Sequence, residues 1–187
     1  MGISVGATVL DSVNLKCKTQ SKIHKREIVK MPEEWAGQVI AIQIASKAGE
    51  KMVPVKEVRA IAGKGLEGDR YLNETGKFSD RPGPGRQLTL IELESIEALQ
   101  REDSIALNPL ESRRNIVTRG VPLNHLVDRR FRVGEVAARG VRLAEPCEYL
   151  EELTQKKVIN GLTHRGGLRA EILEGGIIRV GDQVRPA

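Results

Sequence analysis

The sequence predicts a mainly β protein of the α+β class, built around a β-barrel with a few short helices. Short runs rich in β-branched residues recur along the chain, glycines separate most of the later ones, and only two segments have clear helical character. Many short strands joined by glycine turns are typical of barrels, whereas a layered α/β sheet would alternate its strands with helices.

The first predicted strands lie between residues 38 and 61. Gln38–Ala45 is rich in β-branched residues and ends before the turn-forming segment Lys47–Glu50. Another strand lies within Val53–Ile61, where Pro54 marks a sheet edge or a strand start. We therefore expect the folded body to begin near Gly37.

A long polar loop and the first predicted helix follow. Residues 73–86 end in Pro82–Gly85 and are typical of a loop, and loops of this length in small domains often carry function. Thr89 and Glu92 fit a capping box, in which both side chains satisfy free backbone donors at a helix start. Apolar residues then recur at helical spacing, which predicts a helix over residues 90–101.

The second half of the chain is predicted to contain one more helix and six short strands. The helix candidate is Glu148–Gln155. The strand candidates are Asn115–Thr118, Phe131–Val133, Glu135–Leu143, Leu168–Leu173, Ile177–Val180 and Gln183–Arg185. These strands give the barrel prediction most of its support.

Length and composition exclude several classes of protein. The 187 residues, 40% of them hydrophobic, suffice for one buried core, and no period of about 20 to 50 residues indicates a repeat protein. No apolar run approaches the roughly 18 to 20 residues that cross a bilayer, so we expect no membrane partner. We expect a basic, loosely ordered lead-in over residues 1–36, without the pattern of a secretory signal, and one domain over residues 37–187.

The net charge of +5 is unevenly distributed. Residues 1–30 hold six basic and two acidic residues, so the rest of the chain is nearly neutral. Within that rest, residues 113–142 contain eight arginines, no lysine and two acidic residues. Arginine without lysine favours forked contacts with carboxylate or phosphate oxygens, although Arg129, Arg130 and Arg132 are expected on a solvated face.

The two cysteines, Cys17 and Cys147, predict a reducing compartment, the cytoplasm, because they cannot form a disulfide framework. The three histidines are scattered, whereas tetrahedral zinc needs Cys and His in close pairs, so no zinc is expected. Cys147 follows Pro146 at the start of a predicted helix, where backbone N–H groups would favour a reactive thiolate. A buried, inert thiol is the alternative.

Two polar segments complete the candidate site. Gly63–Gly68 matches G-x-G-x-x-G, but no helix or βαβ unit follows, so a tight loop that fixes Asp69 and Arg70 is favoured over a dinucleotide site. Strand alternation would place Arg113 and Asn115 on one face, able to hold a phosphate or carboxylate, and Arg114 on the other. A solvated edge strand is the alternative.

The remaining candidates lie on either side of Cys147 in the sequence. Thr118 extends the polar cluster that begins at Arg113. His164 lies in the turn His164–Gly167, where a histidine can be a surface residue or a catalytic one.

Seven segments occur in an order and spacing that resemble the MOSC domain, named for the C-terminal part of molybdenum cofactor sulfurases. The resemblance covers roughly residues 37–185, and stand-alone bacterial MOSC proteins are the most similar group. The segments are Gly65–Tyr71, Gln87–Glu92, Arg113–Gly120, Phe131–Gly134, Glu145–Cys147, His164–Gly167 and Gly175–Asp182.

The resemblance implies a barrel-rich fold with Cys147 as the working residue, which would carry sulfur as a persulfide or coordinate the molybdenum of a bound molybdenum cofactor. It also implies Arg113 and Asn115 as phosphate or pterin contacts, and the other candidate cofactor-binding residues are Arg114, Thr118, Arg70 and His164. Relatives that reduce N-hydroxylated compounds usually carry a distinct N-terminal subdomain or a partner-recruiting extension, and this chain has only a short basic lead-in.

The leading hypothesis is a cytoplasmic protein that uses Cys147 for sulfur transfer or for molybdenum-cofactor ligation. As an enzyme it would be a sulfur transferase or a cofactor-dependent reductase, with a sulfur donor such as a cysteine desulfurase, or a molybdoenzyme, as partner. The alternative is a non-enzymatic barrel that binds anions or nucleic acid, although five aromatic residues are few for stacking bases. A scaffold that hands a cofactor between enzymes is a third hypothesis.

Overall fold

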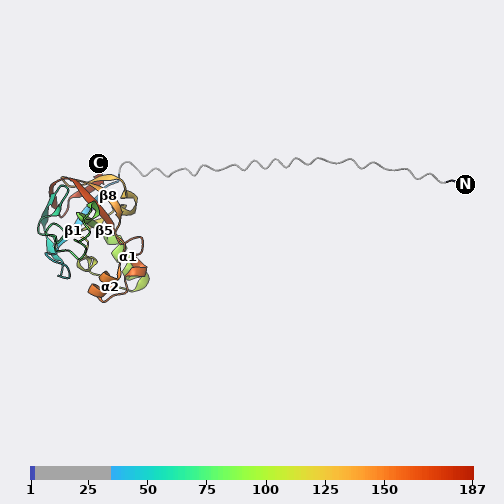
Figure 1. The fold of residues 1–187 in the computed structure, drawn as a ribbon, viewed down its shortest axis with the longest axis horizontal. Coiled ribbons are helices and arrows are strands. Elements are labelled where there is room, and N and C mark those ends of the chain that lie inside the picture. The colour runs from blue at the N-terminus through green and yellow to red at the C-terminus, as the bar shows by residue number, and fades with distance from the viewer. Residues whose placement is uncertain (3–34) are drawn as a thin grey trace. The chain divides into compact units, whose positions relative to one another are not determined.

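The structure is a computed structural model that describes residues 1–2 and 35–187. Residues 35–187 belong to one unit of the chain (Figure 1). The predicted lead-in and Cys17 fall in the segment 3–34, which lies outside the described residues.

Seven strands close into a barrel, in the order β11-β7-β8-β9-β5-β6-β1, and pairing between β1 and β11 completes the ring. All neighbouring pairs are antiparallel except β5 and β6, which are parallel. The strands are β1 (Gly37–Ile44), β5 (Leu88–Glu92), β6 (Ile116–Arg119), β7 (Arg130–Val133), β8 (Val136–Leu143), β9 (Leu168–Glu174) and β11 (Gln183–Pro186). The predicted β-barrel is confirmed.

A second, three-stranded sheet packs on the same core. It consists of β3 (Glu57–Ile61), β4 (Gly65–Leu66) and β10 (Gly176–Arg179), in the order β10-β3-β4. The segment Val53–Ile61, predicted to contain one strand, contains two, because β2 (Val53–Val55) pairs with β1 whereas β3 pairs with β10. Pro54 lies in β2, the last strand of its sheet, as the edge prediction required.

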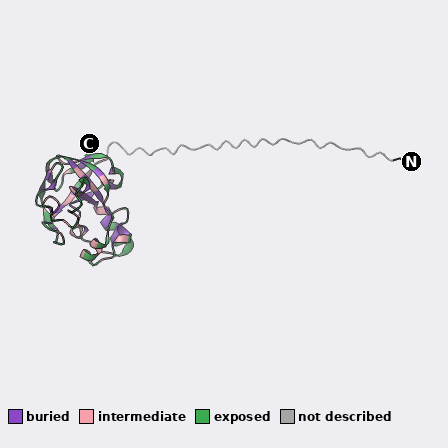
Figure 2. Cartoon of the chain, viewed as in Figure 1, coloured by how far each residue is buried: buried purple, intermediate pink, exposed green. Residues whose placement is uncertain are grey.

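The helices lie outside the barrel, with α1 and α2 below the labelled strands in Figure 1. The α-helices are α1 (Leu93–Asp103), α2 (Glu148–Thr154) and α3 (Ile159–Leu162), and 3-10 turns span η1 (Pro84–Arg86), η2 (Pro109–Ser112) and η3 (Leu123–Leu126). Two apolar clusters result: one inside the barrel around Phe131, and one where Leu99 and Leu162 pack on the outward-facing Ile91 and Val117. Figure 2 shows these buried strand segments in purple.

The predicted start of the first helix is wrong by three residues. Thr89 and Glu92 belong to β5, and α1 begins at Leu93 without a side-chain cap. Thr89 does not cap the helix because it lies within β5, where its hydroxyl accepts from the Asn115 backbone N at 3.0 Å and donates to Asn115 Oδ1 at 2.8 Å. The strand pairings of β5 therefore override the local capping signal, and the helix extends to Asp103.

A very close backbone contact in the barrel occurs at Gly140 in β8. A Cβ atom at this position would lie 2.0 Å from the carbonyl oxygen of Leu126, and the Gly140 carbonyl accepts a hydrogen bond from the Asp128 backbone, 3.0 Å away. Both neighbours are backbone groups, which cannot move aside as a flexible side chain can.

We predict that Gly140→Ala lowers the free energy of unfolding by about 3 kcal/mol, because the added methyl group overpacks a backbone contact. Urea unfolding followed by circular dichroism measures the change. Gly83→Ala is the matched control, since a Cβ at Gly83 meets nothing within 4 Å and the residue is extended, with φ 168°. Equal unfolding midpoints for the two variants would contradict the packing at Gly140.

Candidate functional site

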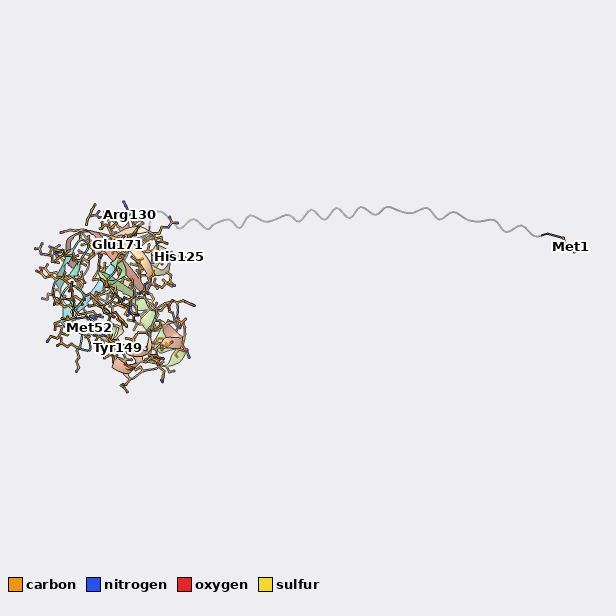
Figure 3. All side chains as sticks on the ribbon, in the orientation of Figure 1. Met1, Met52, His125, Arg130, Tyr149 and Glu171 are labelled. Carbon is orange, nitrogen blue, oxygen red and sulfur yellow. The ribbon has the colours of Figure 1, made fainter. Side chains whose placement is uncertain are left out.

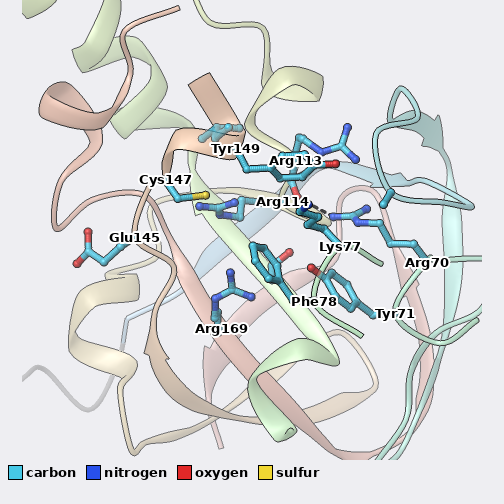
Figure 4. Close-up of a pocket in the computed structure, with 13 residues that line it drawn as sticks. Arg70, Tyr71, Lys77, Phe78, Arg113, Arg114, Glu145, Cys147, Tyr149 and Arg169 are labelled. Atoms are coloured by element: carbon cyan, nitrogen blue, oxygen red, sulfur yellow. Dashed lines mark hydrogen bonds between the residues drawn. The ribbon is translucent and has the colours of Figure 1, made fainter. Parts of the chain in front are cut away.

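A pocket that is partly open to solvent lies against the outer face of β5 and β9 (Figure 4). Alternation along both strands creates this face: Leu88, Leu90, Leu168 and Ala170 point into the barrel core, so Thr89 and Arg169 point outward. Thr89 and Arg169 are register partners in the β5–β9 pair. The charged and thiol side chains that line the pocket are those of Arg70, Lys77, Arg113, Arg114, Glu145, Cys147 and Arg169.

The predicted alternation of Arg113, Arg114 and Asn115 is wrong. Arg113 ends the turn η2 in a left-handed conformation, with φ 58°, and β6 begins only at Ile116. Because the backbone is not extended here, Arg113 and Arg114 both line the pocket, whereas Asn115 does not.

Asn115 is an internal structural residue behind the pocket wall. Its side-chain amide donates to Asp69 Oδ2 at 3.0 Å and to the Gln43 carbonyl at 3.3 Å. Its Oδ1 atom accepts from the Thr89 hydroxyl, so both of its polar groups have partners in the protein. Asn115 is 2% exposed, which makes it a support for Asp69 and Thr89 rather than a ligand contact.

Asp69 and Arg70 are fixed by the glycine loop, as predicted. Gly63, Gly65 and Gly68 all have positive φ, and a turn follows in place of a helix. The Arg70 guanidinium donates to Asp69 Oδ2 at 3.2 Å and to the Arg113 carbonyl at 3.2 Å. The loop therefore delivers one buried ion pair to the pocket wall.

Arg114 is a buried cation that pairs with carbonyl groups. Its Nη2 donates to Ala144 O at 2.6 Å, its Nε to Gly166 O at 2.9 Å and its Nη1 to Ser112 O at 3.3 Å. Burial, followed by repulsion from Arg169, lowers the pKa of Arg114 to about 10, so the group stays charged at neutral pH.

Arg169 is a pocket residue that the sequence analysis missed. Its buried Nε atom has no hydrogen-bond partner among the residues that the structure describes. Burial, followed by repulsion from Arg142, lowers the pKa of the Arg169 guanidinium. No motif marks it in the sequence, but the pairing of β9 with β5 could have pointed to it, because alternation in β9 turns it outward.

Cys147 is exposed, so the prediction of a buried, inert thiol is wrong. It is the N-cap residue of α2 and lies one position before the first helical turn. Figure 4 shows its Sγ atom pointing toward the Arg114 guanidinium, and electrostatic coupling to Cys147 partly offsets the lowering of the pKa of Arg114 and of Arg169. The thiol therefore lies in the field of two cations.

Glu145 and His164 form a clamp beside the Cys147 segment. Glu145 accepts from the His164 backbone N at 2.8 Å, and its other oxygen lies 3.0 Å from His164 Nδ1. Partial burial raises the pKa of Glu145, but the hydrogen bonds and charge of His164 together hold it below its ordinary value. His164 itself does not line the pocket, and Glu145 points away from the arginines in Figure 4.

The other predicted residues lie elsewhere. Thr118 is fully buried and donates to the Ile91 carbonyl at 3.3 Å. Most arginines of the run 113–142 lie on the outside of the barrel, where Arg119 forms an ion pair with Glu97 and Arg132 with Glu174. Arg130 lies at the end of the body opposite to Tyr149 of the pocket (Figure 3). The run is therefore not one anion site.

Aromatic residues, another feature that the sequence analysis missed, line part of the pocket. Tyr71, Phe78 and Tyr149 belong to the lining, and the Phe78 and Tyr149 rings meet edge to face with centroids 6.4 Å apart. Arg86 lies over both Tyr71 and Phe78, at 5.8 and 5.3 Å from the ring centroids. Phe78 lies in the long loop 73–86, which links that loop to the site.

Comparison with known proteins identifies the family. The family model of the MOSC domain matches residues 79–185, which make up more than half of the chain. The chain belongs to the MOSC domain family. No curated protein matches it.

Solved structures share the MOSC fold. The YuaD protein from Bacillus subtilis is 15% identical over 81% of this chain and 97% of its own, with a TM-score of 0.68. YiiM from Geobacillus stearothermophilus is 12% identical over 81% of this chain and 75% of its own, with a TM-score of 0.63. YiiM from Escherichia coli is 18% identical over 83% of this chain and 70% of its own, with a TM-score of 0.56.

Two surveys of the described residues bear on the function. No helix among residues 1–2 and 35–187 is long and apolar enough to span a membrane. The same residues contain no group of three or more His, Cys, Asp or Glu side chains that could hold a metal ion.

We predict that His164→Ala weakens the clamp at Glu145 in a pH-dependent manner. Because the folded pKa of Glu145 lies below the ordinary 4.5, its contribution to stability is present above 4.5 and is lost as the pH falls through the folded value. Urea unfolding should therefore show a deficit for His164→Ala near neutral pH that shrinks under acidic conditions. In a Glu145→Gln background, the stability lost on His164→Ala should be the same at neutral and at acidic pH. A pH-dependent loss in that background would contradict Glu145 as the titrating group.

Proposed function

We propose that the pocket binds the molybdenum cofactor, with Cys147 as a thiolate ligand of the metal and the surrounding arginines as contacts for the cofactor's phosphate. The observation that carries this proposal is the excess of buried and half-buried cations around one exposed thiol. Arg70 is neutralised by Asp69, but no carboxylate pairs with Arg113, Arg114 or Arg169 among the described residues.

The residues of the pocket fit such a group. A thiolate is a soft ligand that suits molybdenum, and guanidinium groups bind phosphate through paired, charge-assisted hydrogen bonds. The Arg169 Nε atom is buried without a partner, which costs about 1 to 3 kcal/mol unless a ligand accepts its hydrogen bond. An anionic ligand would supply that acceptor.

Each residue has a distinct task in this proposal. Arg169 and Arg113 would bind and orient the anionic end of the cofactor, and the exposed Cys147 Sγ would hold its metal end. Tyr71, Phe78 and Tyr149 would cover apolar surface and exclude water, which strengthens electrostatic contacts within the pocket. The molybdenum would supply the redox chemistry of a reductase, and the protein its ligation and orientation.

Sulfur transfer is the second candidate, favoured by the exposure of Cys147 beside two cations. Its thiolate would attack the outer sulfur of a donor persulfide, form a Cys147 persulfide and release the donor as a thiolate. A cysteine desulfurase would suit as donor and a molybdoenzyme as recipient. This route uses the thiol but leaves the buried cations without an anionic ligand, which is why cofactor ligation comes first.

We predict that Cys147→Ser and Arg169→Gln each lower the pterin and molybdenum bound to protein made in a cofactor-competent host. Cys147→Ser removes the metal ligand and should lower molybdenum at least tenfold. Arg169→Gln removes a phosphate contact, worth about 1.5 to 3 kcal/mol for a charge-assisted hydrogen bond, and should weaken pterin retention by a factor of ten or more. Metal analysis and fluorescence of the oxidised pterin measure both.

The matched controls are Cys17→Ser, which changes the other cysteine of the sequence, and Arg130→Gln, which changes an arginine that does not line the pocket. Both should retain wild-type loading. If the protein binds no pterin but releases sulfur to cyanide, and Cys147→Ser abolishes that release, the result would favour sulfur transfer over cofactor ligation. Salt-sensitive affinity for oligonucleotides that survives Cys147→Ser, again without pterin, would favour the nucleic-acid-binding barrel.

A further inference from the structure

We infer that Arg114 is a positioning residue for Cys147, and that it acts by bonding to the backbone around the thiol rather than to the ligand. The inference rests on the proposed role of Cys147 as the working thiol. It differs from the sequence analysis, which named Arg114 among the other candidate cofactor-binding residues.

The donors of Arg114 are committed to the protein. Each of its three nitrogens donates to a different carbonyl group: Ala144 O, Gly166 O and Ser112 O, at 2.6, 2.9 and 3.3 Å. Arg169, by contrast, has a buried Nε atom with no partner. Two arginines that line one pocket thus differ in what they can offer a ligand.

Two of the three carbonyls, those of Ala144 and Gly166, come from segments that pack together beside the Cys147 segment. Ala144 lies three residues before Cys147, and its backbone N donates to Gly167 O at 2.7 Å. Gly166 packs so closely that a Cβ there would lie 2.6 Å from Ala144 O and 3.2 Å from Pro146 N. This contact brings the Gly166 carbonyl beside that of Ala144, so that one guanidinium can bind both.

The burial of Arg114 makes these bonds necessary. The residue is 8% exposed, and burial lowers the pKa of its guanidinium because water no longer solvates the charge fully. A buried cation without an acidic partner is tolerated only when its donors are satisfied. If Ala144 moved outward, Arg114 would lose its shortest hydrogen bond. Because that loss is unfavourable, Arg114 holds the backbone that leads to Cys147 in place.

The geometry also explains why arginine is needed. A guanidinium presents several N–H donors in one rigid plane and can reach three carbonyls on different segments. Lysine would keep the charge but offers a compact ammonium on a flexible stem, which cannot reproduce this planar bridge. Arg114→Lys thus separates the positioning role from the positive charge.

The test needs no cofactor. In a Cys17→Ser background, Cys147 carries a trifluoroethylthio label whose ¹⁹F NMR spectrum reports the order of the segment, and hydrogen exchange reports the Ala144 amide. Arg114→Lys and Arg114→Gln should broaden or split the single ¹⁹F resonance and raise the exchange rate of the Ala144 amide at least tenfold. The amides of β5 and β9 should stay protected.

Arg169→Lys and Arg169→Gln are the matched controls and should keep one resonance and a protected Ala144 amide. Unchanged spectra and exchange in both Arg114 variants would overturn the inference. An even loss of protection over the barrel in both variants would also overturn it, because Arg114 would then support the whole fold. Failure of the molybdenum and pterin assays alone would refute the proposed function and leave this result intact.

Discussion

The site depends on keeping a buried positive charge beside Cys147 without an acid to neutralise it. Desolvation of a guanidinium costs several kcal/mol unless its donors are satisfied, and Arg114 meets this requirement with three carbonyl groups. The irregular backbone around the pocket follows from that requirement. The left-handed Arg113 ends the turn that presents Ser112 O, and Gly166 permits the close approach that presents its own carbonyl beside Ala144 O.

The barrel supplies the rigid wall against which this charge is held. The β5–β9 register sets Arg169 opposite Thr89, and Thr89 in turn binds Asn115 behind the wall. Asp69 is the acid in this wall, and it accepts hydrogen bonds from Arg70, Asn115 and the Tyr71 backbone. Asp69 therefore neutralises Arg70, whereas Arg114 and Arg169, the cations coupled to Cys147, have no carboxylate partner among the described residues.

The sequence predicted the fold better than it predicted the site. Glycine-bounded strands such as Phe131–Val133 and Leu168–Leu173 were placed within a residue or so, since alternation and turn residues are local properties. The site required long-range pairing. Arg169 carries no motif and reaches the pocket only because β9 lies beside β5. The arginine-rich run was misleading, since four of its eight arginines lie on β7 and β8 and face outward from the barrel.

The placement of aromatic residues separates the two proposed chemistries further. The barrel core is mainly aliphatic, with Phe131 as its one fully buried aromatic ring among the described residues, whereas Tyr71, Phe78 and Tyr149 line the pocket. Sulfur relay between proteins needs an accessible thiol but gains nothing from large rings beside it. A bound cofactor gains contact area and shelter from water, and charge-assisted bonds to its phosphate strengthen as water leaves. The aromatic lining and the unpartnered Arg169 Nε therefore favour a resident anionic ligand over a bare sulfur carrier.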